Sequence, residues 1–144
     1  MTAIPHWLPW ALLSAVFAAL TAIFAKLGLQ QVDSDLATLL RTAMVLVLLA
    51  GFVLLVGKWQ NPRSLAPTTW AWLLASAVAT AASWICYFRA LKLGDASPVN
   101  AVDKLSLVLV AVFAFVFLHE RLKGLDWLGV GLVSAGVLLL ALKR

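Results

Sequence analysis

Charged residues are scarce in this chain. Of its 144 residues only 12% are Asp, Glu, Lys or Arg, whereas 64% are hydrophobic. Soluble domains carry about twice this share of charge, so the composition excludes a soluble globular protein. The apolar residues form five long runs between short polar stretches, and the sequence therefore predicts an all-α, polytopic membrane protein. We expect it in the inner (cell) membrane of a bacterium or an archaeon.

Cysteine is nearly absent, and so are the residue groups that carry enzyme chemistry. The single thiol, Cys86, permits no intramolecular disulfide, and among apolar neighbours it is expected to be buried and inert. The sequence has no metal-ligand spacing, no nucleophile with a base and no nucleotide-binding loop, so we expect no metal, no cofactor and no enzyme. Its 11 Lys and Arg residues are dispersed in ones and twos, which argues against nucleic acid as a partner.

Each apolar run is long enough to cross a bilayer core, which takes about 20 residues of helix. The N-terminus lacks the basic region of a signal peptide, so the first run is expected to be retained as a span. Tryptophans near the starts of the first and third runs match the aromatic belt of a membrane interface. Residues 1–144 are expected to form one transmembrane domain, with spans at about 7–29, 36–56, 68–91, 99–118 and 125–142.

A narrow face of the first predicted span consists of small residues. Ser14, Ala18, Thr21 and Ala25 recur at steps of four, three and four, which places them in line on a helix. Small residues at this spacing allow a neighbouring helix to approach closely. Ser14 and Thr21 also suit a solute path, and the two uses can hold at different depths. The glycine-rich fifth span is expected to serve mainly in packing or dimerisation.

The third predicted span carries a polar and aromatic stripe. Ser76, Thr80, Ser83, Trp84 and Tyr87 recur at helical spacing along one side of an otherwise apolar segment. Serine and threonine in membrane helices often bond only to the carbonyl four residues earlier, which is the structural alternative to a binding role. A tryptophan far from the interfacial belt favours binding, because its broad face suits an apolar or aromatic solute, or a cation.

Ionisable residues occur inside the second and fourth predicted spans, where a lipid-facing charge would cost roughly 2.5–3.5 kcal/mol. Arg41 shares a face with two threonines, and it either points into the helix bundle, toward a partner such as Asp103, or snorkels to the near interface. Asp103 and Lys104 either face protein or water, or both lie in the headgroup zone. Asn100 can reach both of them along the helix. A local ion pair between Asp103 and Lys104 is not expected, because adjacent residues on a helix diverge by about 100°.

Three segments carry recognisable motifs: YFRALKLGDASPV at 87–99, FLHERL at 117–122 and WLGVGLVSAGVLL at 127–139. In this order they resemble the second half of an EamA domain, which belongs to the drug/metabolite transporter superfamily. Arg41 also matches an arginine that is common in the family's second helix. The resemblance covers nearly the whole chain. It departs from the family pattern at 102–106, where other members usually have a segment that contains proline.

Most full-length members of that family have ten spans in two EamA repeats, whereas this chain has one repeat. The resemblance therefore implies a half-size member, in which two copies inserted in opposite orientations would reproduce the inverted-repeat transporter. Basic residues barely distinguish the two membrane sides, with four on one side and five on the other: Lys58, Arg63, Arg121 and Lys123 against Lys26, Arg89, Lys92, Lys143 and Arg144. This weak bias fits dual topology, and it also fits one weakly preferred orientation.

From these features we expect a transporter or exporter of a small organic solute, working in the lipid membrane as an antiparallel homodimer with alternating access. The stripe from Ser76 to Tyr87 would contact the solute, with Ser14 and Thr21 opposite it. A charge or gating network would consist of Arg41, Asn100, Asp103 and Lys104. No span carries a carboxylate clearly at mid-depth, so proton antiport is not predicted. The alternative is a non-transporting membrane subunit or lipid-binding module that assembles through the fifth span.

Overall fold

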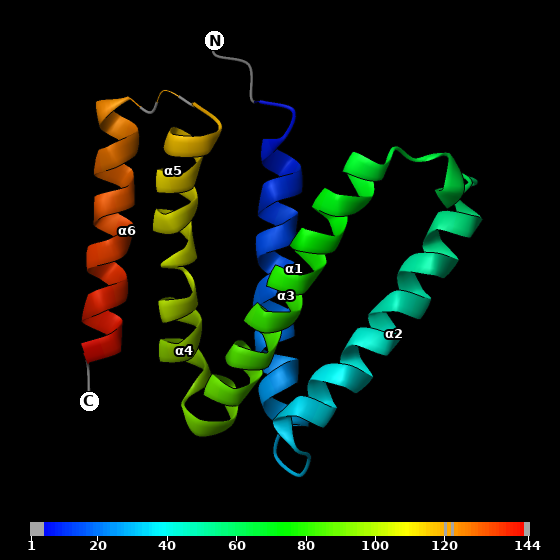
Figure 1. The fold of residues 1–144 in the computed structure, drawn as a ribbon. Coiled ribbons are helices and arrows are strands. Elements are labelled where there is room, and N and C mark those ends of the chain that lie inside the picture. Colours follow the sequence, from blue (N-terminus) through cyan, green and yellow to red (C-terminus); the bar gives the residue numbers. More distant parts are fainter. Residues whose placement is uncertain (1–4, 120, 122, 143–144) are drawn as a thin grey trace. The chain divides into compact units, whose positions relative to one another are not determined.

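The computed structural model describes residues 5–119, 121 and 123–142. Within these residues it contains helices and no strands, which confirms the all-α prediction. The helices are α1 (Leu8–Gly28), α2 (Ser34–Leu55), the short 3₁₀ helix η1 (Pro62–Ser64), α3 (Pro67–Leu93), α4 (Ala96–Asp103), α5 (Ser106–Phe117) and α6 (Gly124–Leu142) (Figure 1). Outside the described residues lie four that the motifs and the charge comparison include, Glu120, Leu122, Lys143 and Arg144.

Five helical segments are long and apolar enough to span a membrane: α1, α2, α3, the α4–α5 pair taken as Ala96–Phe117, and α6. Their bounds fall within a few residues of the predicted spans. Most of their apolar side chains are exposed in the isolated chain, as expected of helices that face lipid. Cys86 is exposed too, so the expectation of a buried thiol was wrong: apolar sequence neighbours on a helix that faces lipid do not bury a side chain within the protein. The chain is an integral, multi-pass membrane protein.

The fourth predicted span is present as Ala96–Phe117, but its α-helix is interrupted near the middle. Helix α4 ends at Asp103 and α5 begins at Ser106. Between them the N–H groups of Lys104 and Leu105 each donate to the carbonyl three residues earlier, over 3.0 Å. This tighter 3₁₀ pattern interrupts the α-helical hydrogen bonds. Asp103 has low helix propensity, and a carboxylate is unfavourable near a helix C-terminus, so both effects favour a break at this point.

The break also overturns the expectation that Asp103 and Lys104 form no local pair. The Nζ of Lys104 lies 3.4 Å from Oδ2 of Asp103. Adjacent residues diverge on a regular helix, but Lys104 terminates α4, and its long side chain turns back toward the carboxylate. The Lys104 side chain is 52% exposed and that of Asp103 is 38% exposed, so the pair adds little stability.

The chain divides into two compact units, one that joins Met1–Phe24 to Leu93–Arg144 and one that consists of Ala25–Lys92. In the first unit α6 packs along α4 and α5 and runs antiparallel to them (Figure 1). Phe115 and Trp127 meet there edge to face, with ring centroids 6.4 Å apart. This aromatic contact joins the last turn of α5 to the first turn of α6.

The second unit contains α2, η1 and nearly all of α3, and its two long helices run antiparallel (Figure 1). Asp33 caps α2, since its Oδ1 accepts hydrogen bonds from the N–H groups of Asp35 (2.9 Å) and Leu36 (3.1 Å). After α2 the chain turns at Gly57, whose φ of 67° is a conformation that glycine adopts without strain. Helix α3 then begins at Pro67, a residue suited to a first helical turn. These local features fix where α2 starts and ends and where α3 starts.

Two lysines tie the end of α3 to the end of α1 in a reciprocal arrangement. Lys26, near the end of α1, donates from Nζ to the carbonyl of Leu91 over 2.8 Å. Lys92, near the end of α3, donates from Nζ to three carbonyls that follow α1, those of Leu29, Gln30 and Val32. Each ammonium therefore satisfies carbonyls at the negative end of the other lysine's helix. The Lys26 ammonium is thus bound to protein.

Candidate functional site

A groove of about 580 Å³ lies between α2 and α3. Its lining on α2 consists of Asp35, Thr38, Leu39 and Thr42. Its lining on α3 consists of Leu73, Ser76, Ala77, Thr80, Ala81, Trp84 and Ile85. Small-molecule sites are commonly about 300–1,000 Å³ in volume and are mostly apolar with a few polar groups. The groove has both properties, and both of its walls belong to the second unit.

The threonine hydroxyls of the groove have their protons engaged by their own helices. Thr38, Thr42 and Thr80 each donate from Oγ1 to the carbonyl four residues earlier, over 2.8, 2.7 and 2.9 Å. The structural alternative for the hydroxyls of the stripe is thereby confirmed at Thr80. A hydroxyl that donates its proton keeps its oxygen lone pairs. These oxygens can therefore accept a hydrogen bond from a ligand.

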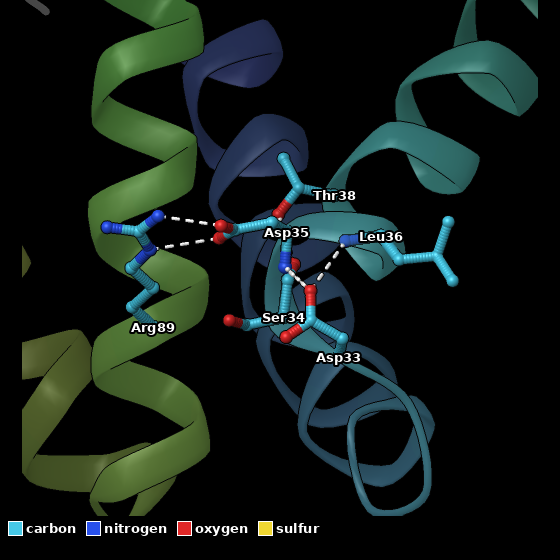
Figure 2. Close-up of polar contacts among 6 residues, drawn as sticks. All are labelled: Asp33, Ser34, Asp35, Leu36, Thr38 and Arg89. Atoms are coloured by element: carbon cyan, nitrogen blue, oxygen red, sulfur yellow. Dashed lines mark hydrogen bonds and ion pairs between the residues drawn. The ribbon is translucent and has the colours of Figure 1, made fainter.

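One charged residue of the groove is paired across the two helices. Figure 2 shows the carboxylate of Asp35, on the first turn of α2, facing the guanidinium of Arg89 on α3. The Nε of Arg89 donates to Oδ1 over 2.9 Å and its Nη2 to Oδ2 over 2.6 Å, so the contact is bidentate. The side chains remain 60% exposed for Arg89 and 49% exposed for Asp35. Asp35 lines the groove whereas Arg89 does not, so the pair forms a polar boundary at one end of it.

Arg41 lies over an aromatic ring of α3. Its Cζ is 4.5 Å from the centroid of the Trp84 ring and 5.6 Å from that of Phe88. Both distances allow cation–π attraction. Of the two alternatives for Arg41, the structure has the guanidinium pointing to the neighbouring helix instead of snorkelling. Asp103 belongs to the other unit, and its pairing with Arg41 stays a prediction.

The structure brings together part of the predicted site. Ser76, Thr80 and Trp84 line the groove, whereas Ser83 and Tyr87 do not. The ring of Tyr87 packs edge-on to its neighbour Phe88, with centroids 6.0 Å apart. The stripe therefore divides, and only the part that looks toward α2 lines the groove.

The remaining predicted site residues lie in the first unit. Ser14 and Thr21 are on α1 and Asn100 is on α4, so their roles in a solute path or a gating network stay predictions. Among the described residues no group of His, Cys, Asp and Glu side chains is arranged to hold a metal ion.

Sequence reasoning missed Asp35 and Arg89 as a pair, and it missed Thr38 and Thr42 as groove residues. A signal was present, because an acid at the start of one span and a base near the end of the next antiparallel span face the same membrane edge. The two threonines were visible as the neighbours of Arg41 on its helical face.

Comparison with known proteins agrees with this architecture. The model of the EamA-like transporter family matches residues 6–142. A Sinorhizobium protein described as an uncharacterized transporter in the cobO 3' region is 55% identical over 94% of this chain and 96% of its own length. No solved structure matches the chain.

Two shorter matches come from Aeromonas. Both relatives are named probable 4-amino-4-deoxy-L-arabinose-phosphoundecaprenol flippase subunit ArnE, and both are 38% identical to this chain. The Aeromonas hydrophila match covers 57% of this chain and 67% of the relative, and the Aeromonas salmonicida match covers 48% and 60%. All three relatives are bacterial, in agreement with the expected bacterial inner membrane.

Proposed function

This chain belongs to the EamA-like transporter family, and we propose that it is a secondary transporter of a small organic solute, with the groove between α2 and α3 as part of the solute site. The single observation that carries the proposal is this groove, which is mostly apolar and places Trp84, Thr80 and Ser76 opposite the threonines of α2. Helix surfaces that only face lipid do not need hydroxyl oxygens around a cavity of this size.

The transporting unit is proposed to be an antiparallel homodimer with alternating access. One EamA-type repeat provides five candidate spans, and transporters built on inverted repeats place their sites between two repeats of opposite orientation. The near balance of basic residues on the two sides supports insertion in both orientations. The solute site would then lie near the membrane midplane between the two copies, and the groove of each copy would form one side of it.

A second candidate is favoured by the names of the Aeromonas relatives, which are flippase subunits. In this case the chain would be one subunit of a membrane assembly with a different partner, and the groove would hold part of a lipid-linked molecule. The two candidates differ in what the chain does alone. The homodimer transports after purification without a partner, and the flippase subunit does not.

The test is transport by the purified chain in liposomes, using a panel of radiolabelled aromatic amino acids, aromatic amines and aromatic acids. We expect counterflow of at least one of these compounds. The variant Trp84→Ala should lower this flux by about tenfold or more, since large aromatic residues dominate binding sites. Its matched control is Trp72→Ala, because Trp72 lies on the same helix, is 78% exposed and is outside the groove.

Two outcomes would count against the proposed transporter. Equal loss of flux in both tryptophan variants would mean that the groove has no special role. Absence of flux for every compound, restored by co-purified membrane proteins from the native host, would favour the subunit candidate.

A further inference from the structure

The lining of the groove contains a carboxylate and no basic side chain. Asp35 is the one ionisable side chain among the eleven residues that line it. The nearest cations, Arg89 and Arg41, are outside the lining. The groove therefore presents a carboxylate at one end and an apolar surface over the rest of its length.

Three threonine hydroxyls of the groove also favour a ligand that donates hydrogen bonds. The hydroxyls of Thr38, Thr42 and Thr80 already donate hydrogen bonds to backbone carbonyls. Their oxygens can therefore accept a hydrogen bond from a ligand, but they have no further proton to donate. A ligand with an anionic or purely accepting head would find no donor in these hydroxyls. A ligand with N–H donors would find several acceptors.

The aromatic ring of the groove is already in contact with a cation. Arg41 lies 4.5 Å from the centroid of Trp84, so a face of the indole is occupied by the protein's own guanidinium. A second positive charge at the ring would be repelled by Arg41. The positive head of a ligand is therefore expected at Asp35, with its apolar body extending along α3 toward Leu73.

Arg89 holds the place that such a head would take. Its guanidinium makes two hydrogen bonds to the Asp35 carboxylate, and 49% of the Asp35 side chain is still exposed (Figure 2). Because both side chains are about half exposed, water screens their attraction, and the pair contributes little net free energy. It can therefore be exchanged for another cation without a large penalty.

We propose that the groove selects solutes with an apolar, aromatic-sized body and a protonated amine, that Asp35 binds the amine, and that Arg89 is the resident competitor which the amine displaces. This inference rests on the proposed function for the use of the groove. It adds the substrate class and assigns opposite roles to the two members of the ion pair. Exchange of one cation for another at Asp35 keeps the carboxylate paired in both the empty and the occupied groove.

Three probes with the same apolar body isolate the effect of the head group on binding. Tryptamine, tryptophol and indole-3-propionate share an indole and a two-carbon arm, and they end in an ammonium, a hydroxyl and a carboxylate. Their binding to the purified full chain in nanodiscs of neutral lipid is measured by equilibrium dialysis, with empty nanodiscs subtracted. We expect tryptamine to bind about tenfold more tightly than tryptophol, because a charged hydrogen bond contributes more affinity than a neutral one. Indole-3-propionate should bind most weakly of the three.

The variants Asp35→Asn and Arg89→Gln separate this role from a structural one. Asp35→Asn should weaken tryptamine binding about tenfold and remove the preference for the amine. Arg89→Gln should strengthen tryptamine binding by about two- to fivefold, because the competitor is gone. Asp95→Asn is the control for loss of one negative charge, since Asp95 precedes α4, makes no side-chain capping bond and is outside the groove.

The outcomes distinguish the inference from the proposed function. If both variants weaken tryptamine binding equally while size-exclusion profiles stay normal, the pair is structural and the inference is wrong. If tryptophol or indole-3-propionate binds as tightly as tryptamine, the amine preference is wrong but the groove remains a solute site. If the unmodified chain binds none of the three probes, the proposed site is wrong as well.

Discussion

Lys92 on α3 and Lys26 on α1 each bind the carbonyl end of the other's helix. The ammonium of Lys92 bonds to the carbonyls of Leu29, Gln30 and Val32, and that of Lys26 bonds to the carbonyl of Leu91. Both helices end at the same membrane edge, where their last carbonyls lack intrahelical partners. The two lysines supply hydrogen-bond donors to these carbonyls, and in doing so they join the ends of α1 and α3 within the unit that contains the groove.

The first prediction concerns the stability that Lys92 provides. Lys92→Met keeps the apolar stem and removes the donor to three carbonyls, so it should destabilise the protein by about 1.5–3 kcal/mol, the usual contribution of a hydrogen bond with a charged partner. Thermal unfolding of the detergent-solubilised protein, followed by loss of the monodisperse size-exclusion peak, measures the effect. Lys58→Met is the control, because Lys58 is exposed in the loop after α2. An equal shift in both variants would contradict the capping role.

The second prediction concerns Arg41 and Trp84. Stacking of this kind contributes about 0.5–2 kcal/mol, so Arg41→Met should destabilise the protein by that amount. In a Trp84→Leu background the same Arg41→Met change should have a smaller effect, because the ring partner is already missing. A double-mutant cycle of unfolding free energies measures the coupling. Strictly additive effects would show that the 4.5 Å contact contributes nothing to stability.

The architecture of the chain was largely predictable, because the bilayer imposes one strong constraint on sequence. Long apolar runs between polar turns fixed the number of spans, and their observed bounds differ from the predicted ones by a few residues. The 3₁₀ break after Asp103 was not predictable from hydropathy, since the segment is apolar on both sides of it. Its signals are low helix propensity and a carboxylate at a helix end, and each of these is weak when taken alone.

Part of the candidate site was also predictable. Helical periodicity placed Ser76, Thr80 and Trp84 on one face of α3, and all three line the groove. Periodicity within one helix cannot say which neighbour covers the face, so Ser83 and Tyr87 were included although neither lines the groove. The pairing of Asp35 with Arg89 joins residues 54 positions apart, and such long-range contacts depend on how the two helices pack.

The third prediction concerns orientation in the membrane. In a Cys86→Ser background, Gln31→Cys and Gln60→Cys place single thiols in exposed loops before α2 and after it. A span separates the two loops, so they face opposite sides of the membrane. If the chain inserts both ways, each thiol should react with a membrane-impermeant maleimide from both sides of the membrane. Labelling of each loop from one side alone would contradict the antiparallel homodimer.

The claim that the groove between α2 and α3 carries the solute is tested most directly by filling it. Thr80→Trp places an indole inside the groove, whereas Val78→Trp places one on the same helix at a side chain that is 62% exposed and outside the groove. Solute flux into liposomes is measured for both variants after size exclusion confirms that both are folded. We predict that Thr80→Trp lowers flux by about tenfold or more, from exclusion of the solute, and that Val78→Trp transports as the unmodified chain does. Normal flux through Thr80→Trp would contradict the account.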